Sequence, residues 1–213
     1  MAEETAGILM AALARAIEAR GHGSLVATGG RSPGRVYDRL AEAEFAWEKV
    51  TVTLSDERCV AACDPNSNEG LLRARLLRGT AVRADFIPLY GADDPEPRLR
   101  ALLPFDAVML GMGEDGHVAS LIPGMPGLAA ALAPDGADLT QNVAEGWGAP
   151  PLARITLTMS AILKSRLVLI LTAGEAKRRV VEAAYGGADL PVRALLAQTR
   201  VPVRVHWSPN HDD

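Results

Sequence analysis

The chain has 213 residues, 48% of them hydrophobic, and a formal net charge of −4, which suits one α/β domain with a sizeable core over residues 1–213. The negative charge and the scattered basic residues argue against nucleic acid or an anionic membrane surface as a partner. No basic region followed by an apolar core opens the chain and no apolar run is long enough to span a bilayer, so we expect a cytoplasmic protein.

The first predicted elements are a helix and a strand. Apolar residues recur at helical spacing between residues 5 and 20, and Gly21 and Gly23 end this helix. Residues 24–28 then form a short expected strand. A helix followed by a buried strand is a typical opening of an α/β fold.

A glycine turn follows this strand and leads into a second helix. Gly29 and Gly30 precede Arg31, Ser32 and Pro33, and Ser32 is expected to cap the helix with Pro33 at its first position. Backbone N–H groups at such a turn point outward, and the helix dipole favours negative charge there. The pattern indicates an anion site, for which a plain strand-to-helix turn is the alternative.

Charged residues follow the second predicted strand, Lys49–Leu54. Asp56, Glu57 and Arg58 are expected at the same edge of the sheet as the glycine turn. They belong either to a solvated loop or to a site, and their spacing alone favours neither. Ser67 is expected to cap the next helix.

The cysteines and three of the histidines do not form a ligand pattern. Cys59 and Cys63 lack Cys-x-x-Cys spacing and an accompanying histidine pair, so we expect reduced thiols rather than a zinc site. His22, His206 and His211 have no partners at ligand spacing. The sequence therefore predicts no bound metal and no cofactor.

The central stretch carries the strongest signal. Phe105–Leu110 is an apolar run that reads as a buried strand. Glycines at G-x-G-x-x-G spacing follow it: Gly111, Gly113 and Gly116. The turn also holds Asp115 and His117, and a histidine beyond the carboxyl end of a strand can act as a general base near neutral pH. A structural turn and a dinucleotide turn are the alternatives.

The last third of the chain adds further strands and a cation. Residues 124–151 are expected to form a surface excursion with one short strand at Thr140–Val143, and such a stretch beside a site can act as a lid. Arg154–Thr158 and Leu167–Leu171 are predicted strands. Lys177 falls in the first turn of the following helix, where a cation opposes the dipole. An anionic ligand would account for it, and a solvated surface lysine is the alternative.

Helices alternate with short buried strands to the end of the chain, where Val201–Trp207 is the last expected strand. Three strand ends carry glycine turns. This pattern predicts an α/β fold with a doubly wound, mostly parallel sheet and helices on both faces.

The central motif resembles a known family signature. Residues 111–124 read Gly-Met-Gly-Glu-Asp-Gly-His-Val-Ala-Ser-Leu-Ile-Pro-Gly, which is similar to the signature of 6-phosphogluconolactonases. These belong to a larger group that includes glucosamine-6-phosphate isomerase/deaminases. The resemblance implies a Rossmann-like domain that binds no nucleotide.

Other motifs of the family follow in the right order. The turn at 29–33 resembles its Gly-Gly-Ser-Thr-Pro phosphate loop but carries Arg31 and Ser32 in place of Ser and Thr. The chain also has matches to the family's Asp-Glu-Arg, Ser-Asn, Arg-x-Thr-Leu and Gly-x-x-Lys motifs: Asp56 to Arg58, Ser67 and Asn68, Arg154, and Lys177.

The resemblance implies hydrolysis of 6-phospho-D-glucono-1,5-lactone to 6-phospho-D-gluconate. The expected catalytic residues are His117 as base, Arg58 or turn N–H groups on the oxyanion, and Asp115 as the partner of His117. The expected substrate-binding residues are Gly29, Gly30, Arg31, Ser32, Asp56, Gly113, Arg154 and Lys177. The expected partner is this small sugar-phosphate lactone, and the expected state is a monomer.

Three alternatives stay open at this point. An isomerase or deaminase of the same fold would show Asn-Glu-Pro where this chain has Ser120-Leu121-Ile122-Pro123. A non-catalytic sugar-phosphate sensor would lose His117 and carry a DNA-binding domain. Ser120 as a nucleophile lacks a Gly-x-Ser-x-Gly elbow, and if residues 117–121 are helical it shares a face with His117 but packs or caps.

Overall fold

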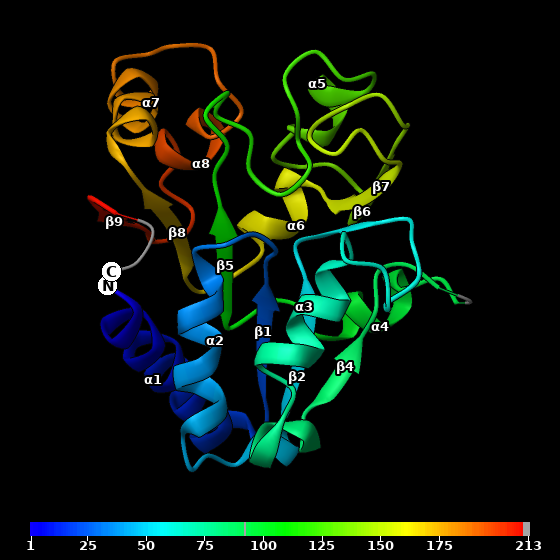
Figure 1. The fold of residues 1–213 in the computed structure, drawn as a ribbon, viewed down its shortest axis with the longest axis vertical. Helices are drawn as coiled ribbons and strands as arrows, with labels where there is room; N and C mark the ends of the chain where they lie inside the picture. The colour runs from blue at the N-terminus through cyan, green and yellow to red at the C-terminus, as the bar shows by residue number, and fades with distance from the viewer. Residues whose placement is uncertain (92, 211–213) are drawn as a thin grey trace.

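The computed structural model describes residues 1–91 and 93–210. Its largest unit is a six-stranded sheet with the order β4-β2-β1-β5-β8-β9 (Figure 1). All neighbouring strands run parallel. The strands are β1 (Gly23–Ala27), β2 (Val50–Leu54), β4 (Asp85–Ile87), β5 (Ala107–Gly111), β8 (Val168–Ala173) and β9 (Val203–Ser208).

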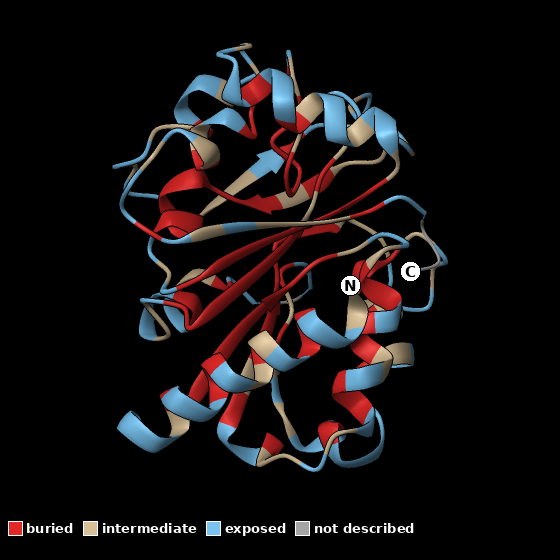
Figure 2. Ribbon diagram, turned by 90° about the vertical axis from the view of Figure 1, so that its left-hand side faces the viewer, coloured by how far each residue is buried: buried red, intermediate tan, exposed pale blue. Residues whose placement is uncertain are grey.

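Helices cover both faces of this sheet, and the buried strands lie between them (Figure 2). On one face α1 packs against α2 and α2 against α3; α7 and α6 pack against α8. The helices are α1 (Ala2–Arg20), α2 (Pro33–Glu42), α3 (Asn68–Arg75), α4 (Glu96–Ala101), α5 (Leu128–Ala131), α6 (Met159–Leu163), α7 (Glu175–Tyr185) and α8 (Arg193–Leu196), with 3-10 turns η1 (Trp47–Lys49) and η2 (Gly79–Arg83). Among the described residues, no helix is both long and apolar enough to cross a membrane.

The strand order explains where a ligand can bind. Beginning at β1, the chain winds outward to β2 and β4, then returns to β5 on the other side of β1 and continues to β8 and β9. The winding direction therefore reverses between β1 and β5, which is where doubly wound sheets open a crevice beyond the strand ends. The doubly wound parallel sheet predicted from the sequence is confirmed.

A second, smaller sheet was not predicted. It is antiparallel, with the order β3-β7-β6, and contains β3 (Asp56–Arg58), β7 (Arg154–Leu157) and β6 (Thr140–Val143). The predicted strands at 140–143 and 154–158 are present, but they join this sheet rather than the parallel one. Residues 56–58, described above as a loop or site segment, are a strand, and Arg58 pairs in register with Arg154.

Candidate active site

A cleft of about 240 Å³ opens where the β1 and β5 turns meet the small sheet. Each predicted site residue except Asp115 lines it. The sequence-predicted lining residues are Gly29, Gly30, Arg31, Ser32, Asp56, Arg58, Gly113, His117, Arg154 and Lys177. Residues separated by almost 150 positions in the chain thus come together at one edge of the fold.

The turn after β1 faces the cleft with its main chain, because glycines occupy positions 29 and 30. Gly30 has a φ of +99°, which L side chains rarely adopt. A Cβ at Gly29 would lie 1.9 Å from Oδ1 of Asn68, so any side chain at this position would displace Asn68. The hydroxyl of Tyr37 accepts a hydrogen bond from the Thr28 backbone N–H at 2.8 Å and holds the end of β1 in place. The turn thus presents main chain at the start of α2, as an anion site requires.

The predicted helix cap at Ser32 is wrong. Pro33 does occupy the first turn of α2, but Ser32 itself already has helical backbone angles and its side chain makes no capping hydrogen bond. A capping residue normally has extended angles that aim its oxygen at the helix amides. At α3 this arrangement is present, because Ser67 is extended and its Oγ accepts the Gly70 N–H at 3.0 Å.

Lys177 reaches the cleft from the first turn of α7. Burial lowers the pKa of its ammonium group, Arg31 lowers it further, and Glu114 and Asp115 oppose these effects. No hydrogen bond or ion pair holds the Lys177 ammonium among the residues that the structure describes. A half-buried cation beside a second cation favours an anionic ligand.

His117 and Asp115 form a pair. Nδ1 of His117 lies 2.6 Å from Oδ1 of Asp115, and the same oxygen accepts the His117 backbone N–H at 3.2 Å. A carboxylate on Nδ1 keeps the proton there, so Nε2 retains a lone pair that can accept another proton. A Cβ at Gly113 would lie 2.3 Å from the His117 ring, which explains the glycine. Residues 117–121 are a turn rather than a helix, so the helical alternative for Ser120 is wrong.

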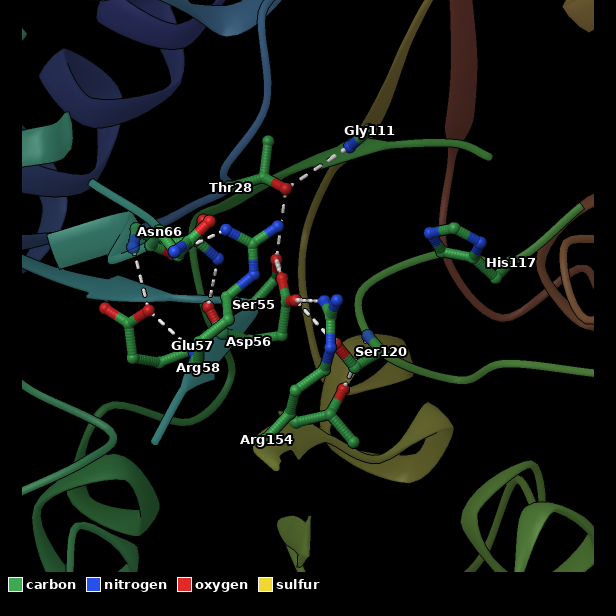
Figure 3. A network of polar contacts seen from close by, with 12 residues as sticks. Thr28, Ser55, Asp56, Glu57, Arg58, Asn66, Gly111, His117, Ser120 and Arg154 are labelled. Atoms are coloured by element: carbon green, nitrogen blue, oxygen red, sulfur yellow. Dashed lines mark hydrogen bonds and ion pairs between the residues drawn. The ribbon is translucent and has the colours of Figure 1, made fainter. Parts of the chain in front are cut away.

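Two arginines reach the cleft from the small sheet (Figure 3). Nη1 of Arg58 donates to the Asn66 carbonyl at 2.6 Å, and Nη2 of Arg154 donates to the Pro150 carbonyl at 2.8 Å. Burial lowers the pKa of Arg154, and the neighbouring Arg58 lowers it further. Within the described part of the chain, the Nε atom of each guanidinium is buried without a hydrogen-bond partner. The Nη atoms carry further N–H groups beyond the two bonds to carbonyls, so both side chains retain donors for a bound oxygen atom.

Asp56 and Ser120 form a hydrogen bond at the base of the cleft. The carboxylate accepts the Ser55 hydroxyl at 2.9 Å and the Ser120 hydroxyl at 2.6 Å, and it lies 3.9 Å from Nη1 of Arg154. Ser120 is fully buried. Since the Ser120 proton is held by a carboxylate that also faces Arg154, this hydroxyl packs in a polar network and does not have the setting of a nucleophile.

Further lining residues were not named individually as site residues. Five of them lie within the predicted phosphate loop or the central motif: Pro33, Gly111, Met112, Ala119 and Ile122. Asn68 had a signal in the Ser-Asn motif, and Gly148 and Ala149 belong to the 124–151 stretch that was expected to lie beside the site. Thr28 and Leu171 had no signal of their own as site residues. The main chain of this wall is shaped by Ala119 at a φ of +50° and Gly148 at +74°.

Metal-ligand clusters are absent from residues 1–91 and 93–210, where no three His, Cys, Asp or Glu side chains are grouped to hold an ion. Cys59 and Cys63 are free thiols. His22 is exposed, and Nδ1 of His206 lies 2.7 Å from the Thr5 hydroxyl. His211 lies outside the described residues.

The fold and the cleft define a class: an α/β protein with a glycine turn at the start of a helix and a histidine–aspartate pair at the switch point of a parallel sheet. The family described as glucosamine-6-phosphate isomerases/6-phosphogluconolactonase matches residues 1–207. The chain belongs to this family.

Named relatives agree with this placement. The chain is 42% identical to a 6-phosphogluconolactonase of Caulobacter vibrioides, over 97% of this chain and 92% of that protein. It is 39% identical to one of Pseudomonas aeruginosa, with 98% and 89% covered. A crystal structure of a 6-phosphogluconolactonase from Shewanella baltica superposes with a TM-score of 0.89 at 36% identity, covering 97% of this chain and 92% of that one.

Proposed function

We propose that this protein hydrolyses 6-phospho-D-glucono-1,5-lactone to 6-phospho-D-gluconate, a step of the oxidative pentose phosphate pathway. The relatives named as 6-phosphogluconolactonases support the reaction at nearly full coverage. The observation that carries the proposal is the 2.6 Å contact between His117 and Asp115 in the same cleft as the β1 glycine turn. The cleft thus combines a base with a site for a phosphate.

Substrate binding uses the cationic walls of the cleft. The phosphate lies on the turn at 29–33, where the backbone amides and the α2 dipole favour an anion. Arg154 and Lys177 reach this group from β7 and α7. Anchoring the phosphate fixes the lactone ring, so that the carbonyl carbon lies beside His117 and a water molecule.

Catalysis then requires one water and no cofactor. Nε2 of His117 takes a proton from the water as its oxygen attacks the carbonyl carbon. Arg58, or N–H groups of the β5 turn, stabilise the oxyanion. When the tetrahedral intermediate collapses, the bond to the ring oxygen breaks and His117 returns the proton to that oxygen. Asp115 stabilises the protonated imidazole and holds its orientation.

The test is hydrolysis of freshly generated lactone, corrected for the spontaneous rate, by the wild type and His117→Ala. Removal of a general base lowers kcat by about 10²- to 10⁴-fold. His22→Ala, at an exposed histidine away from the cleft, is the matched control and keeps the wild-type rate. Equal rates in wild type and His117→Ala would remove this base from the mechanism, and a wild type with no acceleration would refute the function.

We also propose a cytoplasmic monomer in which residues 1–213 form one domain. Light scattering that gives a mass near the 22.5 kDa of one chain would support the monomer. A mass of twice that value would overturn it.

A further inference from the structure

Glu57 is a buried carboxylate with no place in the mechanism above. Its side chain is 2% exposed and it points away from solvent at the centre of β3. Burial raises the pKa of its carboxyl group, and although Arg154 interacts with its charge, no ion pair within 4 Å holds it among the described residues. A buried charge of this kind is costly unless many donors surround it. Its surroundings therefore need an explanation.

Four donors converge on the Glu57 carboxylate. One oxygen accepts the Arg58 N–H at 2.7 Å and the Asn68 N–H at 2.7 Å. The other accepts the Ser67 hydroxyl at 3.1 Å and the Glu69 N–H at 2.6 Å. Three of these donors form the beginning of α3, where the helix dipole favours a negative charge. The carboxylate thus joins β3 to the first turn of α3.

The segments joined in this way carry cleft residues. Nδ2 of Asn68 donates to the Asp56 carbonyl at 2.8 Å, and its Oδ1 occupies the space that a Cβ on Gly29 would need. Nη1 of Arg58 donates to the carbonyl of Asn66, two residues before α3 (Figure 3). The phosphate turn and the Arg58 guanidinium therefore both rest on the segment that Glu57 holds.

We propose that Glu57 is a positioning residue of this site, which fixes Asn68 beneath the phosphate turn and Arg58 beside the reacting carbonyl. The inference rests on the proposed lactone hydrolysis, which it deepens. Glu57 does not touch the substrate. It acts through the start of α3, so its removal shifts groups that do.

The test is Glu57→Gln, which keeps the shape but offers one acceptor oxygen to four donors and turns an NH₂ group toward two of them. Because displacements of about 1 Å in a site can cost about 10²-fold, we expect kcat/KM for the lactone to fall by about ten- to a hundredfold. Calorimetry should show weaker binding of 6-phosphogluconate as well. Glu69→Gln is the matched control, since this neighbouring carboxylate pairs with Arg73 and is not part of the cleft lining. It should change both values less than twofold.

A double-mutant cycle with Asn68→Ala separates positioning from mere stability. If Glu57 acts through Asn68, the two substitutions together lower phosphogluconate affinity by less than the product of their separate effects. Full multiplicativity, or a Glu57→Gln enzyme with wild-type kcat, KM and affinity, would overturn the proposal. Should Glu57→Gln fail to fold, Asn68→Ala decides alone: unchanged KM and affinity would overturn it. A wild type that binds 6-phosphogluconate without hydrolysing the lactone would refute the function. The binding measurements would still test whether Glu57 positions the binding residues.

Discussion

The two halves of the cleft are built in different ways. The β1 and β5 turns of the parallel sheet contribute mainly backbone, with glycines at 29, 30, 111 and 113. The small antiparallel sheet contributes the charged side chains of Asp56, Arg58 and Arg154, and Asp56 and Arg154 are each no more than 5% exposed. The backbone half depends on the absence of side chains at its glycines. The side-chain half depends on the hydrogen-bond and ion-pair partners that stabilise each buried charge.

This difference predicts where the cleft tolerates change. On the proposed phosphate turn, we expect substitutions of Arg31 and Ser32 to be tolerated, because backbone amides do not depend on the side chains. In the small sheet, each carboxylate or guanidinium is bonded to named neighbours, so truncation leaves a buried group without a partner. Substitutions in the two halves should therefore separate steric loss of activity from loss of stability.

The largest effect is expected at Gly113, where the backbone half meets a side chain. In Gly113→Ala the new Cβ would meet the His117 ring at 2.3 Å and Oδ1 of Asp115 at 2.5 Å. The pair must move, and we expect kcat to fall by about 10²-fold or more. Steady-state kinetics measure this. Gly7→Ala, an exposed helix position with open space around its Cβ, is the control and keeps the wild-type kcat. A fully active Gly113→Ala enzyme would contradict the close packing.

Next comes Ser120, in the side-chain half. Ser120→Ala removes the 2.6 Å hydrogen bond to Asp56 and leaves a buried carboxylate oxygen short of a donor. We expect the free energy of unfolding in urea to fall by about 1–3 kcal/mol. Ser55→Ala, which removes the donor to the other oxygen of Asp56, should act in the same direction. Turnover by Ser120→Ala should persist. Its abolition in a folded variant would restore the nucleophile hypothesis.

The contrast also shows what the sequence could predict. Strands of the parallel sheet have apolar runs, and their glycine turns are local patterns, so fold class and turns could be read from short windows. The small sheet could not, because β3 has three charged residues whose burial depends on pairing with β7 about 100 residues later. The four hydrogen bonds to Glu57 could not be predicted for the same reason, because three of the donors lie 10 to 12 residues away in the sequence.

A substitution of Lys177 measures how much this side chain adds to phosphate binding by the backbone turn. Loss of one cation from the anion site in Lys177→Gln should raise KM about tenfold, equivalent to about 1.4 kcal/mol. Arg179→Gln, an exposed position on the same helix, is the control and leaves KM unchanged. The free protein should lose no stability, because burial disfavours the Lys177 charge.

Stability measured as a function of pH tests whether the charge on Lys177 destabilises the folded protein. The folded-state pKa of Lys177 is lowered, so the wild type is penalised while the lysine is charged. That penalty is relieved as the pH rises from below the folded pKa towards the usual value of 10.5. The free energy of unfolding of the wild type should therefore rise relative to that of Lys177→Gln as the pH approaches 10.5. A gain towards lower pH would show that the charge is stabilised instead.

The smallest effect is expected at Ser32, and Ser67 is the position with which it is compared. Ser32→Ala removes a hydroxyl that caps nothing, so the free energy of unfolding should change by less than about 0.5 kcal/mol. Ser67→Ala removes a cap and a donor to Glu57, and should cost about 1 kcal/mol or more. Urea unfolding of both variants makes the comparison. The KM of Ser32→Ala then tells how the turn binds phosphate: an unchanged KM means that the amides hold it, and a raised KM means that the hydroxyl is turned toward the anion rather than toward its helix.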